Sequence, residues 1–281
     1  MTERTLGRLL ASPPLAWLVL LMFGPMALSL ALSLGWSFTT ESRTSFPDAS
    51  AYAALVSDPL YLRALFSSVE LALVSALIAL LIGFPMAFWV ARKPEPLRSL
   101  LLAAISLPLW VSFLVRVYAW MILLGSSGPI NDAMLGLGLS DEPLNLLHSN
   151  AAACIGIAYS YLPFVIFPIY ASLTQQDPHL EDAAADLGAP PAATLLRVTI
   201  PLSRYGIIAG VLLIFVPALG ELVIPELLGG TDTLTLGRVL WTEFFSNRDW
   251  ARSSAIAVVL LLLTAGLFLL SALARRREEQ S

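Results

Sequence analysis

Residues 177–188 of this chain read DPHLEDAAADLG, and residues 189–201 continue as APPAATLLRVTIP. Asp177 suits the N-cap of a helix because its side-chain oxygen can accept a backbone N–H, and Gly188 suits the left-handed residue that ends one. The two prolines after Gly188 are typical of the start of a second helix, which would run to Pro201. The stretch therefore predicts two short helices joined by a tight turn.

The segments on either side of this stretch are strongly apolar. The chain has 281 residues, of which 57% are hydrophobic and 13% charged, whereas a membrane-spanning helix needs about 20 apolar residues. We expect a single all-α integral membrane domain over residues 1–281, with a loop at 173–205 and six spans at about 15–36, 61–90, 99–124, 149–172, 206–228 and 254–273. Prolines within most spans predict kinks, and such breaks favour a transport pathway over a simple anchor.

Basic residues predict the orientation of these spans. One side of the six-span arrangement holds Arg4, Arg8, Arg92, Lys93, Arg98, Arg197, Arg204, Arg275, Arg276 and Arg277. By the positive-inside rule, both termini and the 173–205 loop are cytoplasmic. The first apolar segment is too long for a signal peptide, so we expect an uncleaved span. The outer loops sum to a net acidic charge, which would concentrate a polycation and is also common wherever bases are kept inside.

The paired helices resemble the EAA loop of bacterial ABC-importer permeases, in which an acid, two alanines and a glycine precede an apolar-x-apolar-Pro ending. The matching positions are Asp182, Ala183, Ala184, Gly188, Val198, Ile200 and Pro201. The family usually has Glu where this chain has Asp182, and Glu181 lies one residue too early. The resemblance implies that a cytoplasmic ATPase docks on Glu181, Asp182, Ala183, Ala184, Gly188 and Pro201. The alternative is a solvated amphipathic linker.

Further stretches are similar to the permeases of polyamine importers. They are SFLVRVYAWM at 112–121, YLPF at 161–164, PALGE at 217–221 and PELLGG at 225–230, while residues 237–250 are most similar to the putrescine-type subunit. The resemblance covers about residues 59–260. It implies a type I importer core in the bacterial inner membrane, paired with a second permease, two copies of an ATPase that use ATP and magnesium, and a periplasmic substrate-binding protein.

Three ionisable residues, Glu70, Arg116 and Glu221, lie at similar depth within their predicted spans. Charges inside a membrane are candidates for function. A dicationic alkylamine needs carboxylates for its ammonium ends and aromatic faces for cation–π contact; the candidate faces are Trp110, Tyr118, Trp120 and Tyr159. Alternatively, Arg116 pairs with one of the carboxylates to fix helix packing or extends toward the interface, and the aromatic residues belong to the core.

Chemistry on the chain itself is not expected. A Walker A loop needs Gly-Lys before Ser or Thr, but the single lysine, Lys93, precedes Pro94. His148 and His179 have no companion at metal-ligand spacing, and Cys154 is alone. We expect a non-enzymatic permease with no cofactor or metal of its own and no nucleic-acid partner. The alternatives are an importer of an opine, amino acid or metal, or an ion-driven secondary transporter, whose matched halves are not evident.

Overall fold

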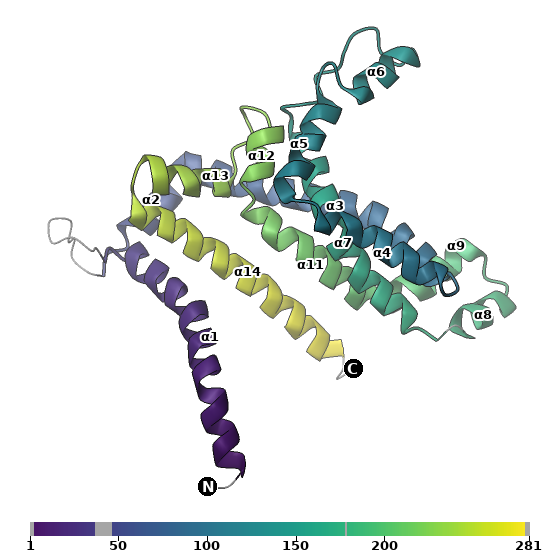
Figure 1. The fold of residues 1–281 in the computed structure, drawn as a ribbon, viewed down its shortest axis with the longest axis horizontal. Coiled ribbons are helices and arrows are strands. Elements are labelled where there is room, and N and C mark those ends of the chain that lie inside the picture. Colours follow the sequence, from purple (N-terminus) through teal and green to yellow (C-terminus); the bar gives the residue numbers. More distant parts are fainter. Residues whose placement is uncertain (1–2, 37–46, 178, 279–281) are drawn as a thin grey trace. The chain divides into compact units, whose positions relative to one another are not determined.

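The computed structural model describes residues 3–36, 47–177 and 179–278, with side chains from residue 12 to residue 273 within these ranges. All regular structure in these ranges is helical (Figure 1). The internal contacts divide the chain into two compact units, one formed by residues 1–63 and 238–269 and the other by 64–237 and 270–281. The single membrane domain stays a prediction. Pro178 and residues 37–46, which belong to the first outer loop of the six-span arrangement, lie outside the described residues.

The first unit is held by polar contacts between its N-terminal and C-terminal parts. It contains α1 (Glu3–Ser33), α2 (Ser50–Ser57), the π-helix η3 (Thr242–Ser246) and most of α14 (Trp250–Glu278). The hydroxyls of Ser33 and Tyr52 lie 2.7 Å apart and join α1 to α2. Tyr61 donates to the buried carboxylate of Glu243 at 2.7 Å, and Asn247 donates to its other oxygen at 3.0 Å. A buried carboxylate needs such partners, so these contacts fix η3.

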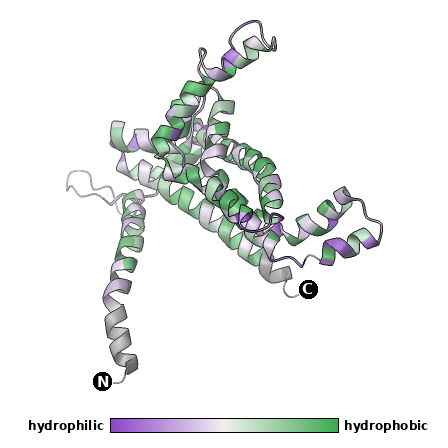
Figure 2. Cartoon of the chain, turned by 45° about the vertical axis from the view of Figure 1, so that its right-hand side comes forward, coloured by the Kyte–Doolittle hydropathy of each residue, from purple (hydrophilic) through white to green (hydrophobic). Residues whose placement is uncertain are grey.

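The second unit carries the stretch from which the fold was predicted. Its helices are α3 (Pro59–Ala91, which begins in the first unit), α4 (Leu97–Trp110), α5 (Phe113–Leu124), α6 (Pro129–Gly136), α7 (Asn150–Thr174), α8 (His179–Asp186), α9 (Pro191–Thr194), the π-helix η2 (Leu195–Thr199), α10 (Ile200–Leu202), α11 (Arg204–Leu219) and α12 (Val223–Leu228); α13 (Leu236–Trp241) runs into the first unit. The long helices are largely apolar, whereas α8 carries several hydrophilic residues (Figure 2).

The centre of this unit is α7, which packs along α11. Two glycines one helical turn apart, Gly206 and Gly210, face α7. A Cβ at Gly206 would lie 2.6 Å from the Pro168 carbonyl oxygen, and one at Gly210 would lie 2.9 Å from that of Val165. Small residues at this spacing let two helix backbones approach closely, which is how helices associate in membranes.

The long helices agree with the predicted spans in part. Within the described residues, five helices are long and apolar enough to cross a membrane: Ser12–Ser33, Pro59–Ala91, Phe113–Gly136, Asn150–Thr174 and Trp250–Leu273. A sixth is obtained if Pro191–Leu202 and Arg204–Leu219, bent by 69°, are counted as one span.

Two predicted spans are interrupted. The third, at 99–124, breaks at Val111 and Ser112, whose backbones are not helical, so α4 and α5 are separate helices. Pro108 lacks an N–H and weakens the end of α4 shortly before the break. The fifth, at 206–228, ends as α11 at Leu219 and restarts as α12.

The close approach of α7 and α11 predicts a strong effect of side-chain volume at Gly210. Gly210→Leu places atoms against the Val165 backbone, which cannot rotate away, and we expect a loss of about 1–3 kcal/mol in the free energy of unfolding. Gly266→Leu is the matched control, because a Cβ at Gly266 meets nothing within 4 Å. Thermal unfolding in detergent measures both. Equal stability of the two variants would contradict the packing.

Candidate coupling loop and pathway residues

We call residues 173–205 the coupling loop. Its first helix, α8, begins and ends where the sequence predicts. Asp177 Oδ1 accepts the backbone N–H of His179 at 3.0 Å, at the start of α8. Gly188 has φ of +79°, a left-handed conformation that glycine adopts without strain. The N–H groups of Gly188 and Ala189 bind the carbonyls of Ala185 and Ala184 at 2.9 and 3.0 Å. Both local predictions are confirmed: the capped start and the glycine stop.

The second predicted helix is also present, starting at Pro191 after the extended Pro190. It runs through α9, η2 and α10 to Leu202 and includes Pro201. Gln176, at the end of α7, donates to Ser203 Oγ at 2.7 Å and to the Thr199 carbonyl at 3.3 Å. These bonds close the base of the coupling loop, because they join the segment that leaves α7 to the segment that enters α11.

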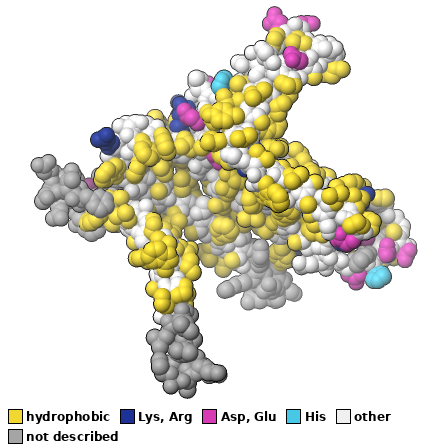
Figure 3. Space-filling view, in the orientation of Figure 1, with side chains coloured by type: hydrophobic (Ala, Val, Ile, Leu, Met, Phe, Trp, Pro, Cys, Tyr) yellow, Lys and Arg dark blue, Asp and Glu magenta, His cyan; other side chains and the backbone are white. Residues whose placement is uncertain are grey.

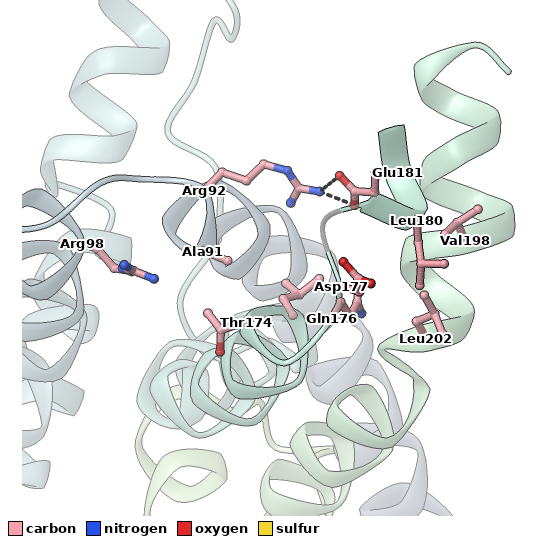
Figure 4. Close-up of a pocket in the computed structure, with 11 residues that line it drawn as sticks. Ala91, Arg92, Arg98, Thr174, Gln176, Asp177, Leu180, Glu181, Val198 and Leu202 are labelled. Carbon is pink, nitrogen blue, oxygen red and sulfur yellow. Dashed lines mark hydrogen bonds and ion pairs between the residues drawn. The ribbon is translucent and has the colours of Figure 1, made fainter. Parts of the chain in front are cut away.

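Glu181 points inward from α8 and binds Arg92 (Figure 4). Arg92 Nη2 lies 2.5 and 2.6 Å from the two Glu181 oxygens, and Thr199 Oγ1 donates to Oε1 at 2.7 Å. Partial desolvation raises the pKa of this carboxyl, but the hydrogen bonds from Arg92 and Thr199 and the charge of Arg92 outweigh it, so the Glu181 pKa lies below its usual value. Glu181 is therefore ionised, and both of its carboxylate oxygens are bound by residues of its own chain.

The other predicted docking residues are more open. The Asp182 side chain is 78% exposed, with its oxygen 3.9 Å from His179 Nδ1. Ala183, Gly188 and Pro201 are exposed and Ala184 is half-buried. Leu187, at the turn, is 90% exposed. Figure 3 shows acidic side chains on the surface of α8. This tip presents an acid and an apolar side chain outward.

A cavity of about 340 Å³ with a mixed polar and apolar lining lies between the coupling loop and the facing end of α3 (Figure 4). Its lining includes Arg92, Arg98, Gln176, Asp177, Glu181 and Leu202. The second arginine, Arg98, is bound to Glu95 at 3.0 Å rather than to the loop. Across this cavity Arg92, at the end of α3, reaches Glu181 of the coupling loop.

Among the predicted pathway residues, Glu221 is the most deeply held, with 8% of its surface exposed. Its Oε2 accepts the Tyr161 hydroxyl at 2.8 Å, and its Oε1 accepts the N–H groups of Val223 and Ile224 at 3.1 and 3.4 Å. It thus satisfies the free N–H groups at the start of α12, as a capping carboxylate does.

Arg116 is held differently from either predicted pairing. Its Nη1 donates to the Ser160 carbonyl at 3.1 Å, and its guanidinium lies 5.7 Å from the Phe113 ring centroid. Its Nε and the Ser160 hydroxyl are buried with no hydrogen-bond partner among the described residues. In this part of the chain Arg116 forms no ion pair with Glu70 or Glu221.

Glu70 occupies a separate place in the second unit. It is exposed on α3 and lines a cavity of about 290 Å³ together with Asn150 and Cys154 of α7. Among the described residues it has no hydrogen-bond or ion-pair partner. The common depth predicted for the three charges therefore does not bring Glu70 into contact with the other two.

The four predicted aromatic residues divide into a packed pair and two exposed side chains. Trp120 and Tyr159 meet edge to face, with ring centroids 5.5 Å apart. Trp110 is 83% exposed and Tyr118 52% exposed. Tyr159 also lines an apolar cavity of about 320 Å³ between α3, α4 and α7.

Sequence reasoning did not select three residues that the structure places in these sites. The sequence indicates Arg92 only as a cytoplasmic basic residue and gives no reason to select Thr199. Tyr161 appears in the YLPF stretch, and an aromatic hydroxyl within an apolar span is a signal that it needs a polar partner. The partner of Arg92, by contrast, is 89 residues away and leaves no local signal.

Comparison with known proteins defines the class. Residues 79–279 match the family model described as "Binding-protein-dependent transport system inner membrane component", and the chain belongs to this family. It is a membrane permease subunit of an ABC importer.

Curated relatives cover nearly the whole chain. "Spermidine/putrescine transport system permease protein PotB" of Salmonella typhimurium strain LT2 is 38% identical over 258 residues, which are 90% of this chain and 88% of the relative. PotB of Escherichia coli K12 is 37% identical over 90% of this chain and 92% of the relative. The predicted resemblance to polyamine-importer permeases is confirmed.

A solved ABC transporter for the import of the acidic polysaccharide alginate has the same fold. It covers 97% of this chain and 95% of its own, with a TM-score of 0.73 and 16% identity. The all-α permease fold is therefore confirmed.

The hydrogen bonds of Glu221 predict which substitutions are coupled. Glu221→Gln and Tyr161→Phe each remove one partner of the same hydrogen bond. The change in the free energy of unfolding of the double variant, measured in detergent, should therefore differ from the sum of the two single changes by roughly 0.5–3 kcal/mol. Arg116 and Glu221 share no hydrogen bond, so Glu221→Gln and Arg116→Gln should depart less from additivity than the Tyr161 pair does. Mutual rescue in the second pair would show that Arg116 neutralises Glu221 after all.

The depressed Glu181 pKa predicts that α8 loosens in acid. Because the folded-state pKa is below the unfolded value of about 4.3, the stabilising contribution is complete above that pH and disappears as the pH falls through the lower value. A nitroxide at position 186, in an Asp186→Cys, Cys154→Ala background, should become more mobile over that range. With Glu181→Gln added, the label should already be mobile at pH 7. The same acid response in both proteins would refute the contribution of Glu181.

Proposed function

We propose that this chain forms half of the translocation pathway for a polyamine, such as putrescine or spermidine. The observation that carries this proposal is the similarity to PotB at 37–38% identity over nine tenths of the chain. The exposed carboxylate of Glu70 supports it, because a cation entering an apolar span needs an unpaired negative charge there.

The remaining subunits of the proposed importer follow from the family and the loop. We infer a second permease subunit, two copies of a cytoplasmic ATPase that bind ATP and magnesium, and a periplasmic substrate-binding protein. In this assembly both termini and the coupling loop are cytoplasmic, and ATP is hydrolysed on the ATPase. The exposed Asp182 and Leu187 at the tip of α8 support docking there, because an acid and an apolar side chain are both available to a partner.

The proposed pathway comprises Glu70, Trp110, Arg116, Tyr118, Trp120, Tyr159 and Glu221, with different roles. Glu70 attracts an ammonium group, and the exposed faces of Trp110 and Tyr118 are available for cation–π contact. Glu221 and the Trp120–Tyr159 pair shape the wall, because their side chains are already packed or hydrogen-bonded. Arg116 contributes a positive charge that a cation must pass.

Reconstitution tests the substrate. The chain is co-expressed with its genetic neighbours, placed in liposomes, and assayed for ATP-dependent uptake of labelled putrescine, spermidine, an amino acid and an opine. We expect uptake of the polyamines alone, and Glu70→Gln should lower it while ATPase activity persists. Uptake of another solute without either polyamine would contradict the assignment.

Docking through α8 predicts a strict requirement at position 188. Proline fixes φ near −65°, so Gly188→Pro cannot form the left-handed turn measured at +79° and should abolish ATP-dependent uptake. Gly188→Asn is the matched control, because asparagine tolerates the left-handed region, and it should retain most activity. Both variants should insert and assemble. Normal uptake by a well-inserted Gly188→Pro protein would show that α8 does not dock the ATPase.

A further inference from the structure

Arg92 is positioned by the last turn of α3 before it reaches any other element. It directly follows Ala91, the final residue of that helix. Its Nη1 donates to the Phe88 carbonyl at 3.3 Å, and its guanidinium carbon lies 3.4 Å from the Phe88 ring centroid. These contacts hold the guanidinium against its own helix and leave Nη2 for Glu181.

The contact continues from Glu181 into the base of the coupling loop. Thr199, which donates to Glu181, is buried. Its carbonyl accepts from Gln176 at the end of α7 and from the Ser203 hydroxyl at 2.7 Å. One carboxylate thereby joins α8 both to η2 and to the inner end of α3. We name the Arg92, Glu181 and Thr199 side chains the Arg92 tie.

We propose that the Arg92 tie transmits the displacement of α8 to α3, so that Arg92 and Glu181 are positioning residues for transport rather than contacts of the ATPase. The proposal rests on the docking of α8 proposed above. It assigns the ATPase-facing acid to Asp182, because both Glu181 oxygens are already bound within the chain.

The geometry supports transmission because the tie crosses a cavity that both elements line. A cavity beside this contact is lined by Ala91 and Arg92 at the end of α3 and by Leu180, Glu181 and Val198 of the coupling loop. The guanidinium reaches both carboxylate oxygens, and charge-assisted bonds of this kind are short and directional. Since α3 also carries Glu70, a movement passed through Arg92 reaches the helix that holds the proposed cation ligand.

The test uses the complete importer in liposomes, with ATP hydrolysis and putrescine uptake measured on the same preparation. Arg92→Gln and Glu181→Gln should retain hydrolysis but lower the uptake per ATP by roughly fivefold or more, the range of ordinary site-to-site coupling. The reversed pair, Arg92→Glu with Glu181→Arg, should restore much of the uptake per ATP. Lys93→Gln removes a neighbouring charge that contacts Trp89 instead, and should leave the ratio unchanged.

A second measurement reports on the tie directly. Spin labels at positions 94 and 186, in a Cys154→Ala background, measure the distance between the end of α3 and α8 in the assembled importer. We expect a narrow distribution that Arg92→Gln broadens and the reversed pair narrows again. An unchanged uptake ratio in Arg92→Gln, or a distribution unaffected by it, would overturn the proposal. The docking on which the proposal rests is tested separately, by cross-linking α8 to the ATPase in a chain with Arg92 and Glu181 intact. If no cross-link forms there, the docking itself is wrong.

Discussion

The close packing of α7 against α11 at Gly206 and Gly210 determines the geometry of the coupling loop. The two helices approach so closely that a Cβ at either glycine would lie within 3 Å of a backbone carbonyl. Because the coupling loop leaves α7 and returns into α11, this contact brings its two ends together, and Gln176 bonds across them. The loop is thus anchored on a closely packed helix pair.

The ionisable side chains within the apolar helices differ in how fully they are satisfied. Glu221 has its acceptors filled by Tyr161 and the start of α12, so its cost of burial is offset locally. Arg116 is bound through one nitrogen only, and Glu70 has no partner among the described residues. An exposed, unpaired carboxylate in an apolar helix is costly unless water, a partner subunit or a cation meets it, which makes Glu70 the focus of the proposed pathway.

Local sequence signals predicted local structure well. The cap at Asp177, the turn at Gly188 and the helix after Pro190 are present because each depends on backbone preferences of one or two residues. The sequence does not predict the break at Val111, because Pro108 lies three residues earlier, where it predicts only a kink, and the apolar run continues through the break. The Arg92–Glu181 pair was missed because it depends on how distant helices pack. The similar depth of the three charges within their spans does not predict which of them meet, because charges at one depth can lie on different sides of their helices.

The most direct test of this account is a photo-crosslink from the tip of the coupling loop. A benzoylphenylalanine at position 187 replaces Leu187, whose side chain is 90% exposed. In the assembled importer, illumination should join this chain to the cytoplasmic ATPase, while the same group at Ile122, exposed on α5, should not. Cross-linking at Ile122 but not at Leu187 would contradict the account, because α8 would then not be the site where the ATPase binds.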